Sequence, residues 1–379
     1  MDTKKNPFRF GQLVKGEDFC NRQAELHEIK TAIHNNYSFW IYSPRRFGKT
    51  SLLLKALAEF PEIKTVYIDL YNVESLSAFA EKYSQAVIRE LFDWKSGIKN
   101  IGKKLSGFFK HIVPQISFDA AGNPSIAFEA GVREDKIDIE NILDIPEQIA
   151  TEQKIHVCIA FDEFQEVQRI SPFLVNWMRA SFQTHQQISY IFLGSKQSLM
   201  ETLFADANSP FYEFGFKMTI KEISRPDWQI FIKEKFAKTG LHIPAQTITA
   251  ILDKSGGHPH FTQYFASVAW DFIRAGDEPE APGFTDVWMT HILRAQSNVF
   301  QNLFDPLNKN QRKTLQAIAA LQPGEQLFSE KYRIRHRLPV SSTLTATINS
   351  LQKNNFLQKQ EDGYSISNPI FKEWLLQMV

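Results

Sequence analysis

Residues 43–50 read Ser-Pro-Arg-Arg-Phe-Gly-Lys-Thr, a combination of residue types suited to holding a polyphosphate. They follow an apolar run at 38–42, which predicts a strand, and they open an amphipathic segment at 50–60, which predicts a helix. In this context backbone amides wrap phosphate oxygens, and the helix N-terminus adds positive potential. The segment therefore predicts a phosphate-binding loop.

Each side chain of this loop has an expected role. Gly48 permits close approach of the backbone, Lys49 bridges the terminal phosphates, and Thr50 offers its hydroxyl to Mg²⁺. Ser43 stands where the motif usually has its first glycine. The residues expected to contact the nucleotide here are Ser43, Pro44, Arg45, Arg46, Phe47, Gly48, Lys49, Thr50 and Ser51.

Two adjacent carboxylates, Asp162 and Glu163, end a second apolar run at 157–161. A phosphoryl-transfer site needs a carboxylate for its metal and a group that orients water, both at the end of a buried strand. We expect Asp162 to bind Mg²⁺ and Glu163 to activate the attacking water. The alternative is a pair of carboxylates that merely solvates a strand end.

Ser195 follows Gly194 at the end of the next apolar run, 189–193. Its hydroxyl is placed to sense the terminal phosphate. Gly-Ser is also a common turn pair, so a simple turn is the alternative.

Apolar runs alternate with amphipathic segments over the first 224 residues. Strands are expected at 38–42, 64–70, 155–161, 189–193 and 217–223, and helices at 22–36, 50–60, 77–92 and 137–152. This alternation predicts an α/β fold, a parallel P-loop NTPase sheet covered by helices on both faces. Alternation of period two at 115–130 predicts a β-hairpin inserted at about 113–131.

Strand patterns disappear after Pro226. Four amphipathic helices are expected at 227–238, 245–254, 259–275 and 287–301, which predicts an α-helical lid domain. Helices at 310–321, 329–338 and 341–354, followed by a two-stranded ribbon, have the order of a winged helix. The predicted domains are an ATPase domain at 1–224, a helical lid at 225–304 and a winged helix at 305–379.

Composition excludes several other classes of protein. The 43 basic residues nearly balance the 42 acidic ones, so no global field attracts nucleic acid or an anionic membrane. Only Cys20 and Cys158 are present, which argues against a disulfide scaffold. The N-terminus lacks the apolar core of a signal peptide and no run is long enough to span a bilayer, so a cytoplasmic location is expected.

Taken together, these segments resemble the archaeal-type ATPase family of the STAND clade, within the AAA+ P-loop NTPases, over nearly the whole chain. Residues 44–52, 161–165 and 191–195 are similar to the family's phosphate loop, Walker B strand and sensor strand. Residues 19–26 resemble its Phe-x-Gly-Arg-Glu segment, which borders the adenine and implies a role for Arg22; Asn21 and Gln23 replace the Gly and Glu.

The resemblance extends to 256–259, Gly-Gly-His-Pro, which is similar to the clade's Gly-x-Pro motif. It implies that Pro259 packs on adenine and that His258 lies near the phosphates. An ordinary helix N-terminus is the alternative for His258. Arg179 and Arg46 are the candidates for an arginine finger, and both are equally compatible with a scaffold role.

The resemblance implies an ATP hydrolase that requires Mg²⁺, alternates between ATP and ADP, and acts as a regulatory switch on an unknown protein partner. One alternative is a DNA-binding regulator, because residues 305–379 hold ten Lys or Arg against six Asp or Glu, a net charge of plus four. The expected recognition helix at 341–354 has only Lys353 as a cation, which is poor for anchoring phosphate. A winged helix that packs on protein is therefore an alternative of at least equal weight to one that binds DNA. A third class is a homo-oligomeric remodelling motor, with the hairpin as a substrate or subunit contact or only a local sheet extension.

Overall fold

The computed structural model describes residues 5–14, 16–92, 115–118, 124–127, 138–220, 222–360 and 363–378. The chain divides into two compact units. One unit is Leu13–Glu222, and the other joins Met1–Gln12 to Ile223–Val379. The chain therefore passes from one unit to the other twice, after Gln12 and after Glu222.

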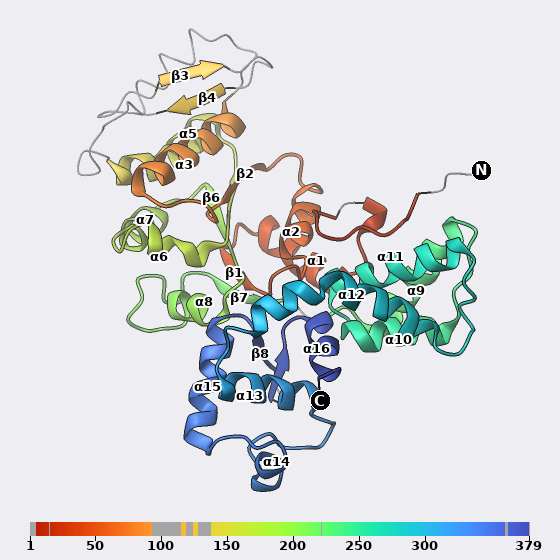
Figure 1. Ribbon diagram of the computed structural model, residues 1–379. Helices are drawn as coiled ribbons and strands as arrows, with labels where there is room; N and C mark the ends of the chain where they lie inside the picture. The colour runs from red at the N-terminus through yellow and green to blue at the C-terminus, as the bar shows by residue number, and fades with distance from the viewer. Residues whose placement is uncertain are drawn as a thin grey trace. The chain divides into compact units, whose positions relative to one another are not determined.

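The first unit contains a five-stranded parallel sheet, as predicted (Figure 1). Its strands are β1 (Phe39–Tyr42), β2 (Lys64–Asp69), β5 (Val157–Asp162), β6 (Ile188–Gly194) and β7 (Phe216–Thr219), in the order β2-β5-β6-β1-β7. The strand β6 thus lies between β1 and β5. This order brings the ends of these three strands to neighbouring places at one edge of the sheet.

Helices cover both faces of the sheet, because its strands are apolar on both sides. Along β5, Val157, Ile159 and Phe161 face one core, while Cys158 and Ala160 face the other. The first core also contains side chains of α3 (Leu76–Leu91), α5 (Ile139–Gln153), α7 (Leu174–Phe182) and α8 (Gln197–Phe204). The second contains side chains of α1 (Gln23–His34) and α2 (Lys49–Leu57). Short elements are η1 (Gly16–Asp18), η4 (Phe164–Glu166) and α6 (Val167–Ile170).

The predicted hairpin is present as two antiparallel strands, β3 (Gln115–Phe118) and β4 (Pro124–Ala127). In Figure 1 it lies beside α3, outside the five-stranded sheet. The turn between the strands and the end of the predicted hairpin, at 119–123 and 128–130, fall outside the described residues.

The second unit is helical with a small two-stranded sheet. Its elements are α9 (Arg225–Lys238), α10 (Ala245–Ser255), α11 (Pro259–Ala275), α12 (Phe284–Phe304), α13 (Lys309–Ala320), α14 (Glu330–Arg335), α15 (Ser341–Lys353), β8 (Leu357–Gln360), β9 (Gly363–Ile366) and α16 (Pro369–Leu376). The order from α13 to β9 is that of the predicted winged helix. Phe300 of α12 packs on Phe371 and Trp374 of α16, so this helix continues into the core of the winged helix.

Some boundaries differ from the sequence prediction. The helix expected at 329–338 ends at Arg335, and Arg337 adopts a left-handed backbone with φ +51°, which an α-helix does not contain. The strand expected at 217–223 is the shorter β7. The helices α8 and α16 were not predicted.

The N-terminal residues pack against the second unit, although the sequence analysis places them in the ATPase domain. Phe8 is 3% exposed and its ring lies 5.5 Å from that of Phe236 on α9. The Asn6 side chain donates to Ser267 O of α11, at 3.0 Å. We call residues 5–12 the N-terminal arm. No helix in the described part of the chain combines the length and apolarity that spanning a membrane requires.

Candidate functional site

The predicted phosphate loop lies between β1 and α2, as its sequence context requires. Gly48 is the N-cap of α2 with φ +89°, a backbone conformation that side chains rarely adopt. A Cβ atom at this position would meet no heavy atom within 4 Å, so the space beside the Gly48 Cα is open. Ser43 Oγ is buried and has no hydrogen-bond partner among the described residues.

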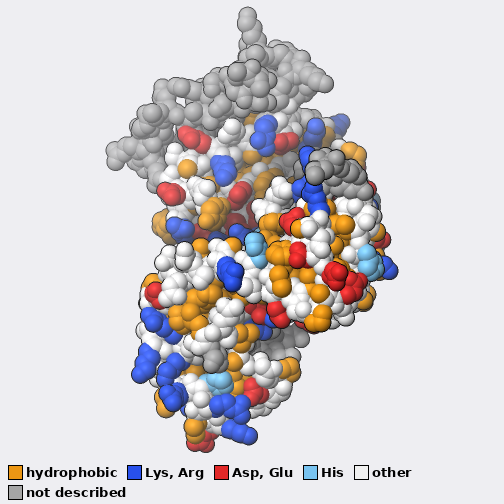
Figure 2. Space-filling view, turned by 45° about the vertical axis from the view of Figure 1, so that its right-hand side comes forward, with side chains coloured by type: hydrophobic (Ala, Val, Ile, Leu, Met, Phe, Trp, Pro, Cys, Tyr) orange, Lys and Arg blue, Asp and Glu red, His pale blue; other side chains and the backbone are white. Residues whose placement is uncertain are grey.

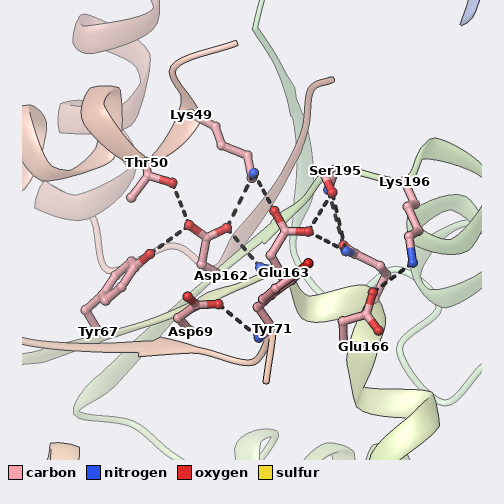
Figure 3. Close-up of polar contacts among 11 residues, drawn as sticks. Lys49, Thr50, Tyr67, Asp69, Tyr71, Asp162, Glu163, Glu166, Ser195 and Lys196 are labelled. Atoms are coloured by element: carbon pink, nitrogen blue, oxygen red, sulfur yellow. Dashed lines mark hydrogen bonds and ion pairs between the residues drawn. The ribbon is translucent and has the colours of Figure 1, made fainter. Parts of the chain in front are cut away.

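The loop and the two carboxylates meet in one cluster (Figure 3). Lys49 Nζ lies 2.9 Å from Glu163 Oε1 and 3.6 Å from Asp162 Oδ1. Thr50 Oγ1 donates to Asp162 Oδ2 at 2.5 Å. Residues 112 to 114 positions apart in the sequence are therefore in direct contact, which follows from the parallel order of β1, β6 and β5.

Glu163 is held by several donors at once. Its backbone has φ +52°, and its Oε2 accepts from Ser195 Oγ at 2.5 Å and from Gln165 Nε2 at 2.6 Å. Burial by itself would raise the pKa of Glu163, but the Lys49 charge and the hydrogen bonds from Ser195, Lys49 and Gln165 lower it below the usual value. The carboxylate is therefore held in its charged form, the form that can accept a proton.

Sequence reasoning missed two polar residues of this cluster. The Tyr67 hydroxyl of β2 donates to Asp162 Oδ2 at 2.7 Å. Gln165 is 1% exposed and bridges Glu163 and Ser195. Tyr67 lies outside the quoted motifs, and Gln165 ends the segment 161–165 but had no expected role.

Two further contacts connect the end of β6 to its neighbours, one to the segment after β5 and one to the phosphate loop after β1. Lys196 Nζ lies 2.9 Å from Glu166 Oε1, and the Glu166 side chain is only 5% exposed. The amide of Ser43 donates to Gly194 O at 3.2 Å, which joins the phosphate loop to the end of β6. These contacts hold Ser195 next to Glu163, and its contact with the terminal phosphate stays a prediction.

The cluster suits a Mg²⁺-bound triphosphate. The Thr50 hydroxyl and the Asp162 carboxylate present oxygen atoms at one point, and oxygen is the ligand that Mg²⁺ prefers. The Lys49 ammonium, the open side of Gly48 and the unpaired Ser43 hydroxyl supply donors for phosphate oxygens. Thr50 and Asp162 are the residues that would hold the metal.

Two predicted site residues, Arg22 and Arg179, lie outside the cluster of Lys49, Asp162 and Glu163. Arg22 Nη2 donates to Phe47 O at 3.1 Å, and its guanidinium also lies over the Phe47 ring, so it supports the phosphate loop. Arg179 Nε donates to Pro210 O at 2.9 Å and its Nη1 to Gln183, contacts that fix a surface loop.

Arg46, His258 and Pro259 are the other predicted site residues, and each lies at a loop or at the start of a helix. Arg46, in the phosphate loop, has φ +62°. His258 and Pro259 form the N-cap and first residue of α11, in the other unit. The His258 ring accepts from the His260 amide at 3.3 Å, a contact typical of a helix start. Their contacts with nucleotide stay predictions.

Known structures share the fold of this chain. The chain is similar over 99% of its length to 99% of a Walker-type ATPase of Pyrococcus abyssi, with 18% identity and a TM-score of 0.65. It is also similar to the ORC2 protein of Aeropyrum pernix in its ADPNP–ADP complexes, with 12% identity, 94% and 93% coverage and a TM-score of 0.50. At these identities the likeness concerns the fold. No curated protein matches the sequence.

Family comparison adds two assignments. Residues 298–377 match the family described as "Probable winged helix domain", which agrees with the order of α13 to β9. Residues 19–263 match the family described as "ATPase domain predominantly from Archaea", and this stretch is more than half of the 379 residues. The chain therefore belongs to the family of ATPase domains found predominantly in Archaea.

Proposed function

We propose that the chain binds ATP with Mg²⁺ at the cluster around Lys49 and hydrolyses it. The observation that carries this proposal is the direct contact of the phosphate loop with both carboxylates, Lys49 with Glu163 and Thr50 with Asp162. Membership of the ATPase family supports the same conclusion. The assignment of each residue's role below belongs to this proposal.

In the proposed reaction the chain positions and neutralises the phosphates and supplies a base. Lys49 and the amides around Gly48 bind phosphate oxygens, and Thr50 and Asp162 hold the metal. When bound, Mg²⁺ supplies charge neutralisation at the phosphates. Glu163 orients a water molecule and accepts its proton, for which its lowered pKa keeps it ionised. Ser195, bonded to Glu163, is placed to contact the terminal phosphate.

A turnover assay tests this proposal. Wild-type chain is expected to release phosphate from ATP in the presence of Mg²⁺, and Lys49→Ala and Glu163→Gln are expected to abolish steady-state turnover, with at most a slow residual single-turnover rate. Glu163→Gln should keep nucleotide binding, because it removes the base and leaves the phosphate loop intact. Lys30→Ala and Glu59→Gln are matched controls, because this Lys–Glu pair lies on the same unit outside the site. A wild-type chain that fails to bind ATP, or that binds it without turnover, contradicts the proposal.

We further propose that the site works as a regulatory switch of the STAND type, in which nucleotide controls the other unit and a protein partner. Lys49 is paired with Glu163 in this structure, and phosphate must compete with Glu163 for the same ammonium. Nucleotide binding thus rearranges the cluster, and a differential affinity for two arrangements is what a switch requires. His258 and Pro259, at the start of α11 in the second unit, are the residues of that unit that we propose contact the nucleotide.

Scattering measurements test the switch. Glu163→Gln holds ATP without turnover under the proposal above, so its radius of gyration is expected to differ between ATP and ADP. His258→Ala should reduce that difference while leaving binding at the phosphate loop in place. Identical scattering curves with ATP, with ADP and without nucleotide would contradict the proposed switch but not the proposed ATP hydrolysis.

DNA binding is the second candidate function, because the chain contains a winged helix with a basic end. Figure 2 shows Lys and Arg side chains gathered at its lower end, the place of α14 in Figure 1. Within α14 and just beyond it the cations are Lys331, Arg333, Arg335 and Arg337. However, Arg335 pairs with Glu325 at 2.7 Å, and Arg333 donates to Phe328 O at 3.3 Å.

Gel shifts of the full chain at increasing salt separate DNA binding from protein packing. A DNA reader is expected to lose affinity steeply with salt, and Lys331→Ala should reduce the slope by about one. If binding changes neither with salt nor in Lys331→Ala, the winged helix is not a DNA reader and its role is to pack on protein. The third candidate, a homo-oligomeric motor, predicts a larger particle mass with ATP than without it.

A further inference from the structure

The side-chain hydrogen bonds of Gln165 join the ends of β5 and β6. Its Nε2 donates to Glu163 Oε2 at 2.6 Å and lies 3.5 Å from Ser195 Oγ. Its Oε1 accepts from the Ser195 amide at 3.2 Å. The side chain is 1% exposed, so each of these bonds is shielded from water.

The amide orientation of Gln165 follows from its neighbours. The Ser195 backbone N–H can only donate, so the amide oxygen must face it. This leaves the NH₂ group directed at the Glu163 carboxylate, which can only accept while it is ionised. The bridge therefore has one consistent arrangement, and both of its ends lie on proposed site residues.

The other donors to Glu163 have a second task in the proposed reaction. Lys49, which holds Oε1, is proposed to bind phosphate, and Ser195, which shares Oε2, is proposed to sense it. Gln165 has no such task, because its remaining bonds go to Ser195. It is thus the donor that can hold Glu163 whether or not the other two turn to phosphate.

The surrounding packing fixes Gln165 in place. A Cβ atom on Gly194 would lie 2.8 Å from Gln165 Oε1 and 2.3 Å from the Met200 side chain, so the absence of a side chain at Gly194 leaves room for the amide. The neighbouring ion pair of Glu166 with Lys196 joins the same two segments again. A site whose supporting residues are locked in this way is preorganised.

We infer that Gln165 is a positioning residue for ATP hydrolysis, which sets the Glu163 carboxylate and the Ser195 hydroxyl in a fixed relation. The inference rests on the proposed hydrolase. Gln165 acts through Glu163 and touches neither the phosphates nor the water. Loss of Gln165 therefore lowers kcat and leaves nucleotide affinity unchanged.

Two variants separate the halves of the bridge. Gln165→Glu keeps the shape and the acceptor for the Ser195 amide but cannot donate to Glu163 when ionised. Gln165→Met keeps the length and removes both bonds. Both are expected to lower kcat roughly 10- to 100-fold, the usual effect of losing one hydrogen bond to a charged group. The dissociation constant for ADPNP should stay within about threefold of the wild-type value.

A double-mutant cycle distinguishes positioning from a general structural effect. If Gln165 works through the Glu163 carboxylate, Gln165→Met should not further lower the residual single-turnover rate of Glu163→Gln. Gln197→Met is the matched control, because Gln197 makes a comparable bond to Glu201 at 3.0 Å on the same unit. This control should keep wild-type kcat. Hydrogen exchange of peptides from β5 and β6 identifies variants that fail to fold, and Gln165→Met, which adds no charge beside Glu163, is the deciding variant where Gln165→Glu fails.

The results that would overturn the inference are specific. Folded Gln165→Glu and Gln165→Met with kcat within about threefold of wild type would exclude positioning, as would equal losses in the wild-type and Glu163→Gln backgrounds. In both cases Lys49→Ala and Glu163→Gln would still be inactive, so the proposed hydrolase would survive. A wild-type chain without turnover would instead contradict the proposed ATP hydrolysis and, with it, the inferred role of Gln165.

Discussion

Replacing Lys49 by Met should destabilise the first unit even without nucleotide. At an effective dielectric of about 20, the attraction of the ammonium to Glu163 at 2.9 Å is about 6 kcal/mol, and to Asp162 at 3.6 Å about 5 kcal/mol. Desolvation of the buried ions offsets much of this gross attraction. What remains decisive is that Met leaves two neighbouring carboxylates, 7% and 14% exposed, without their cation.

The expected loss is therefore about 3 to 5 kcal/mol of unfolding free energy, the usual cost of removing one partner from a buried pair. Glu163→Gln should restore part of it, because it removes one of the two stranded charges. The double variant should show a coupling energy of about 2 to 3 kcal/mol. Lys30→Met, which breaks an exposed pair with Glu59, should cost less than about 1 kcal/mol.

Hydrogen exchange is the appropriate assay, because the chain has two units and a single melting curve would mix them. Peptides from β5 and β6 report the first unit alone. Protection in Lys49→Met that stays within about 0.5 kcal/mol of wild type would refute the reasoning, and so would strict additivity in the double variant. Either result would mean that water or a rearranged side chain already neutralises the carboxylates.

Three further predictions follow from contacts around the site and the arm. Burial raises the pKa of Glu166, but hydrogen bonds from Lys196 and a neighbouring arginine outweigh burial and hold this pKa below its usual 4.5. The ionised carboxylate therefore stabilises the fold above about pH 4.5, and this stabilisation is lost as the pH falls through the folded-state pKa. Glu166→Gln should therefore flatten the acid limb of an unfolding-versus-pH curve, and an unchanged limb would contradict the assignment. Tyr67→Phe removes a donor to Asp162 and should raise the Mg²⁺ concentration for half-maximal turnover about 10-fold, with ATP affinity at saturating Mg²⁺ unchanged. Phe8→Ala should lower the stability of the second unit by up to about 3 to 5 kcal/mol, seen as faster exchange in α9 and α11, and equal protection would show that the arm contributes nothing.

The sequence predicted the parts of the site that are local in the chain. The phosphate loop depends on eight consecutive residues between a strand and a helix, and the acidic pair depends on one buried strand, so both were identified with their positions. Their contact was expected because both motifs follow parallel strands. The hairpin was predicted for the same reason, since period two and a Gly-Asn-Pro turn are local signals.

The residues that were missed depend on the strand order. Tyr67 reaches Asp162 only because β2 pairs with β5, and Gln165 reaches Ser195 only because β6 is the other neighbour of β5. Neither pairing has a signal in the sequence around these residues. The docking of Phe8 could not be predicted either, because its partner Phe236 lies more than 200 residues later in the chain.

The N-terminal arm has a consequence for synthesis of the chain. During translation Phe8 leaves the ribosome before the five strands of the large sheet, and α9 and α11, on which the arm packs, are made only after those strands. The sheet unit can therefore complete its core before the helices that the arm packs on have been synthesised, and the arm docks only after that. A tag fused directly before Asn6 is a perturbation of that step and not a neutral handle.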